Sequence, residues 1–270
     1  MRTKFLTCAL LSLSVAAATQ DPNTLFEKAQ QAQAKRDYGK AIALLKKADA
    51  AWDNSLPNAP EHVAALDLII VLIKAQAADD SNRRGEKDFG VPLAAWRRDA
   101  APFARRAVEI CDASQHVQPE YEALALELEA DVLGRDAEGA PFWARATKIR
   151  AERVAHLASF PPPEQLPPDQ ETQPSPTPSP AITQRPRLIA KREPEYTETA
   201  RLMRYSGSAL FSIIIDQHGV PKHIRLVRGL GYGLDEQAAK AVGSWRFRPA
   251  LNHDIPVAVQ ANIEVNFRLL

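Results

Sequence analysis

The side chains that most often carry out chemistry are thinly spread along this chain. None of its six histidines stands at metal-ligand spacing from another histidine, a cysteine or a pair of carboxylates; they are His62, His116, His156, His218, His223 and His253. No Gly-x-Ser-x-Gly motif marks a nucleophile. The Gly-rich run 229–233 lacks the Lys and the Ser or Thr of a phosphate loop. The sequence therefore predicts no catalytic residue, no metal site and no cofactor, and it favours a protein that is not an enzyme.

Cysteine chemistry is equally restricted. Of the two cysteines, Cys8 lies in the N-terminal apolar run and Cys111 lies beside Val108 and Ile110 in a helical pattern. If the N-terminal run is removed, Cys111 remains by itself and cannot form an internal disulfide. A buried, unreactive thiol is the favoured interpretation, and a thiol that is reactive or joins two copies is the alternative.

The chemistry that the sequence does offer is backbone hydrogen bonding near the C-terminus. Between residues 257 and 269, apolar and polar side chains alternate strictly, which is typical of a strand with one buried face. If this strand lies at the edge of a sheet, its free N–H and C=O groups can pair with an extended segment of another chain. The apolar positions of this strand include Val259, Ala261, Ile263, Val265 and Phe267.

The elements that must position this strand are visible in residues 187–270. A short helical face around Tyr196 precedes a strand that begins at Gly207, and the turn 216–219 leads into a second strand that ends near Arg228. Apolar residues from Leu234 to Trp245 recur on one helix face. The order helix, strand, strand, helix, strand predicts a small antiparallel sheet covered by two helices.

These residues resemble the C-terminal domain of TonB-type energy transducers over about residues 190–270. The resemblance is carried by Pro194-x-Tyr196 with Ala200-Arg201, by Gly207, by Asp216-x-x-Gly219, and by Leu234-Asp235-x-x-Ala238-x-x-Ala241-x-x-x-Trp245-x-Phe247-x-Pro249-Ala250. In that family the domain lies in the periplasm and binds a short segment of outer-membrane transporters in a way that resembles strand addition. The resemblance therefore implies a docking strand from Val259 to Leu269, with Pro194, Tyr196 and Arg201 close to the segment that enters the domain.

Two positions depart from the family pattern. Thr197 stands where the family commonly has proline after the tyrosine. Family transducers also keep an N-terminal membrane anchor bearing a histidine that engages a proton-driven motor, and residues 5–18 contain no histidine. The resemblance thus leaves coupling to the proton gradient open.

Residues 22–159 have helical periodicity throughout. Thr24 and Glu27 match a capping box at the first helix, and three later helices are expected at Leu93–Ala113, Pro119–Leu133 and Pro141–Ser159. Ala-Pro-Phe recurs at 101–103 and 140–142, each time followed by Arg-Ala and Ile at equal distances. This period suits two-helix units and resembles tetratricopeptide-like repeats, with an ordinary helical bundle as the alternative.

The remaining segments connect and target these parts. Residues 160–186 are rich in proline, which favours an extended linker, either a spacer across the periplasm or a plain tether. Residues 1–20 have the basic start, short apolar core and small residues of a signal peptide. We therefore expect export to the periplasm, with attachment to the inner membrane if the signal is not cleaved. The expected architecture is α+β: helical-hairpin repeats at 22–159, a linker at 160–186 and the small sheet domain at 187–270.

The net charge argues against one class of partner, nucleic acid, and several other partners remain possible. The formal net charge is +1 over 270 residues, so no electrostatic footprint for nucleic acid is present. The expected partners are an outer-membrane transporter or another envelope protein at the sheet domain, and a second protein at the helical part. A homodimer through the sheet domain is a further alternative. The functional hypotheses are an energy-transducer relative, a periplasmic scaffold that is not energised and, least favoured, an accessory protein of an enzyme.

Overall fold

The computed structural model describes residues 21–55, 59–83, 93–114, 117–135, 138–159 and 182–269. The expected signal peptide at 1–20 lies outside these residues, as does the expected linker at 160–186 except for its last five positions. Within the described ranges, no helix combines the length and the apolar character that crossing a membrane requires.

Six helices occupy the described residues of the N-terminal part. They are α1 (Pro22–Ala34), α2 (Tyr38–Ser55), α3 (Pro60–Arg83), α4 (Leu93–Ala113), α5 (Pro119–Leu133) and α6 (Ala140–Ser159). The three later helices lie where the apolar periodicity predicts them. The first helix begins earlier than the capping box suggested, because Asp21 is its N-cap and accepts a hydrogen bond from the Thr24 amide at 2.9 Å.

Each helix packs against the next one along the chain, and α3 also packs against α5. Their buried faces form a core that includes Leu45, Trp52, Leu66 and Ile110. This arrangement is consistent with helical hairpins. The two Ala-Pro-Phe motifs occupy different places in their helices, however: Pro102 lies inside α4, whereas Pro141 lies in the first turn of α6.

The C-terminal part combines short strands with two helices, which confirms the α+β class. Its elements are β1 (Arg187–Ala190), α7 (Glu198–Leu202), β2 (Gly207–Ile215), β3 (Pro221–Arg228), α8 (Leu234–Ser244), β4 (Arg246–Arg248), β5 (Ala250–Asn252), β6 (Ile255–Val257) and β7 (Val259–Phe267). An antiparallel sheet has the order β3-β2-β7, and two ribbons pair β1 with β4 and β5 with β6. The pattern alone missed β1, β4, β5 and β6, because three or four residues are too few to show a period.

The turn between β2 and β3 is fixed by its side chains and by a glycine. Asp216 accepts hydrogen bonds from the backbone amides of His218 and Val220. Gly219 has φ +78°, and a Cβ added there would lie 1.7 Å from the carbonyl oxygen of Phe247. Only glycine fits this position without displacing β4, because both the backbone conformation and the space exclude a side chain.

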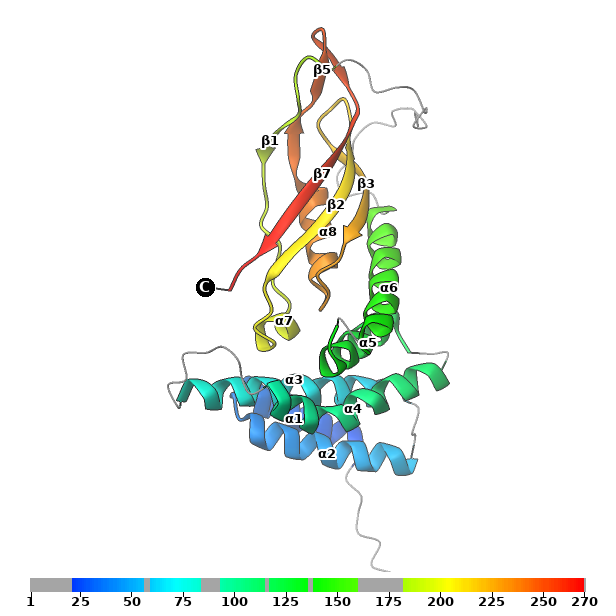
Figure 1. Ribbon diagram of the computed structural model, residues 1–270, viewed down its shortest axis with the longest axis vertical. Helices are drawn as coiled ribbons and strands as arrows, with labels where there is room; N and C mark the ends of the chain where they lie inside the picture. The colour runs from blue at the N-terminus through cyan, green and yellow to red at the C-terminus, as the bar shows by residue number, and fades with distance from the viewer. Residues whose placement is uncertain are drawn as a thin grey trace, which may run out of the picture.

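The helical part and the C-terminal part pack against each other. Helix α6 lies alongside β3, on the side away from β2, and also contacts α8, while α7 contacts α3 (Figure 1). One hydrophobic cluster continues across this junction, with Ile70 and Leu128 from the helices and Met203 and Phe211 from the C-terminal part. Helix α6 therefore flanks one edge of the three-stranded sheet, and the β7 edge is left at the other side.

Candidate partner-binding edge

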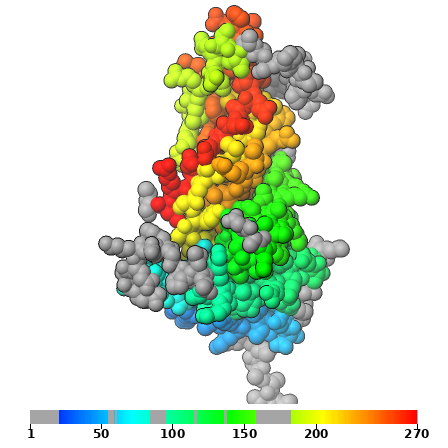
Figure 2. All heavy atoms as spheres, viewed as in Figure 1, coloured from blue at the N-terminus to red at the C-terminus, as the bar shows by residue number. Residues whose placement is uncertain are grey.

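Strand β7 pairs with β2 along one of its two sides. Its register with β2 is continuous from Ile215 opposite Val259 to Gly207 opposite Phe267. Among the residues that the structure describes, no strand pairs with its other side. In the space-filling view β7, drawn in red, lies on the surface of the molecule (Figure 2). The long edge strand expected from the sequence is therefore present, and the use of this edge by a partner is taken up below as a proposal.

The hydrogen bonds of the β2–β3 turn decide which backbone groups of β7 face outward. The Asp216 amide donates to the Val220 carbonyl at 3.0 Å, so the preceding carbonyl, that of Ile215, points the opposite way, towards β7. Because β2 is regular along β7, its residues direct their backbone groups alternately to β3 and to β7. Pro221, which has no N–H, lies opposite Ile215 and needs no partner there.

It follows that the backbone N–H and C=O groups of Val259, and of every second residue after it, form hydrogen bonds with β2. The residues between them direct both their N–H and C=O groups to the open edge: Gln260, Asn262, Glu264 and Asn266. The sequence showed that an edge could exist, but it could not show which backbone groups were already used, because that depends on the register with β2.

The side chains of β7 separate into two faces, as the alternation predicts. Val259, Val265 and Phe267 are buried, whereas Ala261 and Ile263 are half-buried. The polar side chains between them are exposed, and Gln260 donates to the Ser212 hydroxyl at 2.9 Å on the neighbouring strand. A strand added at this edge would meet apolar surface at Ala261 and Ile263 on the inner face and amide groups on the outer face.

The segment that enters the domain reaches β7 through Tyr196. The ring of Tyr196 meets that of Phe267 edge to face, with centroids 5.4 Å apart, and its hydroxyl donates to the Tyr205 carbonyl at 2.7 Å. The indole of Trp245 donates to the Arg192 carbonyl at 2.8 Å, which holds the same segment against α8. Of the three residues expected here, Tyr196 therefore contacts β7 directly.

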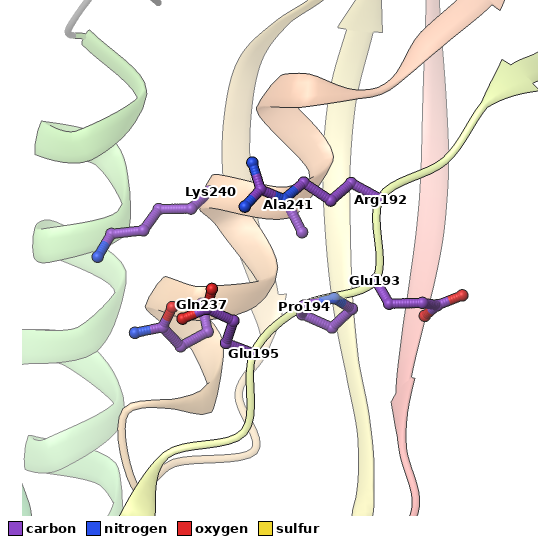
Figure 3. Close-up of a pocket in the computed structure, with 7 residues that line it drawn as sticks. All are labelled: Arg192, Glu193, Pro194, Glu195, Gln237, Lys240 and Ala241. Carbon is purple, nitrogen blue, oxygen red and sulfur yellow. The ribbon is translucent and has the colours of Figure 1, made fainter.

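Pro194 and Arg201 are placed differently. Pro194 lines a hollow of about 280 Å³ between the entering segment and α8, together with Arg192, Glu193, Glu195, Gln237, Lys240 and Ala241 (Figure 3). Arg201 lies in α7 with an exposed side chain. The structure thus brings Tyr196 to the edge and sets Pro194 beside α8.

Buried charges, which sequence reasoning missed, join the domain to the helical part. The Arg150 guanidinium donates to both carboxylate oxygens of Glu127, at 2.9 and 3.1 Å, and to Glu236 at 3.0 Å. Arg150 is 4% exposed and Glu127 1%. Burial acts to raise the pKa of Glu236, but Arg150 outweighs it and holds that pKa below the usual value. These groups neutralise each other at the junction, which accounts for a buried cluster without invoking catalysis.

A second polar cluster lies at the same junction. Arg135 stacks on Trp143 with 3.6 Å from its guanidinium carbon to the ring centroid, and it donates to Asp131 and to the hydroxyls of Tyr205 and Tyr232. The Tyr232 hydroxyl donates to Asp131, and the Tyr232 amide donates to Glu127 at 2.8 Å. Aromatic and charged groups from both parts therefore fix the loop 229–233.

Asp235 and Glu236 have roles that their position at the start of α8 did not reveal. Asp235 accepts hydrogen bonds from the amides of Leu230 and Gly231 at 2.8 and 3.0 Å. Burial raises the pKa of Asp235 to about 6, although these two hydrogen bonds oppose the shift. The Gly-rich run is thus an anchored loop, and the sequence signal that could have indicated this is the acidic pair directly after it.

Other candidate chemistry is accounted for by contacts within the chain. The structure brings Asp49, Asp53 and His62 together, with potential ligand atoms within 4.8 Å of one another. Asp49 is bonded to the buried His62 ring at 2.7 Å, and Asp53 is paired with Arg106 at 3.0 Å. Cys111 is buried, and burial raises the pKa of its thiol to about 12, which favours an unreactive thiol. His116 lies outside the described residues.

Comparison with known proteins agrees with this geometry. Residues 192–269 match the family described as Gram-negative bacterial TonB protein C-terminal. These residues are a TonB C-terminal domain. The TonB C-terminal domain of this chain therefore comprises the entering segment, both helices of the C-terminal part and strands β2 to β7, whereas β1 and the helical part lie outside the match.

A curated relative supports the same assignment. The chain is 30% identical over 110 residues to Protein TonB of Vibrio cholerae serotype O1 (strain ATCC 39315 / El Tor Inaba N16961). The aligned region covers 38% of this chain and 45% of the relative. The chain thus matches less than half of the relative's length, so the likeness concerns a part of each protein and not the whole.

Proposed function

We propose that this protein is a TonB-like protein of the bacterial cell envelope that binds an extended segment of an outer-membrane transporter at the open edge of β7. The observation that carries the proposal is the row of outward-facing backbone groups at Gln260, Asn262, Glu264 and Asn266, on a strand of a TonB C-terminal domain. Strand addition would satisfy these groups, and the half-buried Ala261 and Ile263 would receive apolar side chains of the partner.

The position of α6 supports binding at this edge and not at the other. Helix α6 lies along β3, so an incoming strand would have to displace a helix there. On the β7 side the partner would lie next to Tyr196, which packs on Phe267. Arg201 and Pro194 stay in the proposal as residues that shape the surroundings of this edge.

Photo-crosslinking in the intact bacterium tests this proposal. A photoreactive phenylalanine analogue at Gln260 or Asn262 should form crosslinks to an outer-membrane transporter, identified by mass spectrometry, while the same analogue at Gln30 on α1 should not. Crosslinks from all three positions to the same proteins, or none to an envelope protein from β7, would remove the proposal.

Coupling to an energy source separates the two leading hypotheses. In a transducer, residues 1–20 would stay in the inner membrane, whereas a periplasmic scaffold would lose them. N-terminal sequencing of the protein after fractionation into membrane and periplasm tells these apart. The accessory protein of an enzyme remains the least favoured alternative, since Arg150, Glu127 and Glu236 at the junction are paired with one another.

The junction also restricts how a second partner could bind. Helices α3, α5 and α6 contribute side chains to the junction with the C-terminal part, through Asp79, Glu127, Asp131 and Arg150. A second protein would therefore bind the helical part on α1, α2 or α4. A homodimer in which two β7 edges join would compete with the transporter for the same backbone groups.

A further inference from the structure

One end of the C-terminal part carries an unusual combination of side chains. We call it the arm, which comprises residues 182–190 and 246–257 and so contains β1, β4, β5 and β6. Strand β1 pairs with β4, β5 pairs with β6, and Gln184 bridges to Leu251, so these segments lie side by side. The arm lies at the end of the molecule away from α1 and α2 (Figure 1).

The arm is basic. It contains the arginines Arg185, Arg187, Arg246 and Arg248, and its one acidic residue is Asp254. Arg246 donates to the carbonyl oxygens of Gly243 and Trp245, whereas Arg185, Arg187 and Arg248 are exposed.

Two of these arginines lie directly opposite each other. Arg187 pairs with Arg248 in the β1–β4 register, which places both side chains on the same face of the ribbon. Like charges at opposite positions repel. Within the part of the chain that the structure describes, no carboxylate forms an ion pair with either of them. An anion that contacted both guanidinium groups would remove this repulsion.

Exposed aliphatic side chains accompany the arginines. In the described ranges, several large hydrophobic side chains are exposed, and four of them belong to the arm. Their exposed fractions are 40% for Ile182, 43% for Leu188, 64% for Ile189 and 66% for Ile255. Exposed aliphatic groups that gather in one part of a molecule mark an interaction surface. Basic and aliphatic groups exposed in the same part of a molecule are the combination that binds to anionic membranes, where phosphates meet the cations and acyl chains meet the apolar groups.

We propose that the arm docks on the surface of an anionic phospholipid membrane. A second copy of the chain is a poorer occupant, because a symmetric contact would bring the Arg187–Arg248 pair of each copy together. Docking would place the start of β7, which follows the arm in the chain, next to the membrane surface. The docking surface is separate from the β7 edge, so it holds whether or not β7 binds a transporter.

Vesicle cosedimentation of the full chain tests this. Binding is measured to vesicles of phosphatidylcholine alone and of equal parts phosphatidylcholine and phosphatidylglycerol. We expect binding to the anionic vesicles, weakened by added sodium chloride. Substituting both Arg187→Gln and Arg248→Gln should raise the lipid concentration for half-maximal binding about tenfold, because each arginine near an anionic surface contributes to affinity. Ile189→Ser with Ile255→Ser should weaken binding at unchanged charge.

The matched control removes two cations elsewhere on the same domain. Lys222→Gln with Arg225→Gln, both exposed on β3, should leave binding close to the wild-type level. Circular dichroism and size-exclusion chromatography verify that every variant keeps its fold and oligomeric state. Equal losses in both arginine and control variants, equal binding to neutral vesicles, or displacement by inorganic phosphate alone would each overturn the proposal.

Discussion

Arg150 of α6 and Glu236 of α8 form a buried ion pair, 3.0 Å from Nη1 to Oε1, across the junction between the helical part and the TonB C-terminal domain. Glu127 of α5 binds the same guanidinium from the other side. The junction is therefore held by a charge cluster whose members come from three separate helices, and the domain does not rest on apolar contact alone.

Arg150→Met should destabilise the protein strongly. It leaves the Glu127 carboxylate buried without its cation and leaves Glu236 paired with Arg153 only, and removing one partner of a buried pair costs about 3–5 kcal/mol. Urea unfolding measures the loss in unfolding free energy. Arg153→Met is the control, since Arg153 bonds to the same Glu236 oxygen but is only partly buried, and it should cost clearly less. Equal stabilities of the two variants would contradict the structural role of Arg150.

Asp235 should make stability depend on pH. Because its pKa is raised to about 6 in the folded state, mainly by burial, the contribution is fully present below its unfolded pKa near 4 and is lost as the pH rises through 6. The difference in unfolding free energy between wild type and Asp235→Asn should therefore fall by roughly 3 kcal/mol between pH 3 and pH 7. Urea unfolding at several pH values measures this difference. A difference that does not change with pH would show that burial does not raise the pKa of Asp235.

Gly219→Ala should destabilise the C-terminal part by more than about 2 kcal/mol. The left-handed conformation penalises any side chain, and the new methyl would overlap the Phe247 carbonyl. Gly39→Ala is the matched control, since its added methyl would meet nothing within 4 Å, and in helix α2 alanine should stabilise by up to about 1 kcal/mol. Thermal unfolding of both variants should shift the midpoint in opposite directions.

Proline substitutions should distinguish the open groups of β7 from those bonded to β2. Asn262→Pro removes an outward N–H and should weaken binding of a transporter segment about tenfold while the fold persists. Val265→Pro removes a group bonded to β2 and should unfold the sheet. Asn262→Ala keeps the N–H and controls for the side chain. Binding is followed by the photo-crosslinking yield at Gln260, and normal crosslinking by Asn262→Pro would show that the edge is not used.

Cys111 should resist alkylation in the folded protein. Its thiol is 6% exposed and has a pKa of about 12, raised by burial and by the negative charge of Asp67, so little thiolate forms at neutral pH. Iodoacetamide labelling followed by mass spectrometry should proceed only in denaturant. Rapid labelling of the folded chain would indicate that the helical core opens around α4.

The sequence determined the elements whose apolar residues repeat over several turns or strand positions. The helices from Leu93 to Ala113 and from Pro119 to Leu133 lie where their periodicity places them, as does the strand that ends at Phe267, because burial of one face fixes the period locally. The spaced residues from Pro194 to Ala250 were also sufficient to indicate the TonB-type C-terminal domain. The short strands β1 and β4 were not predicted, because they form only by pairing with each other.

Which side chains and backbone groups of these elements meet depends on the tertiary structure. Nothing local to Arg150 or Glu236 shows that they meet, since 86 residues separate them and their bond arises only when α6 lies against α8. The same holds for the edge: alternation shows that β7 has two faces, but only its register with β2 and the position of α6 along β3 decide which backbone groups stay open. Periodicity depends on neighbours in sequence, whereas hydrogen-bond use and charge burial depend on neighbours in space.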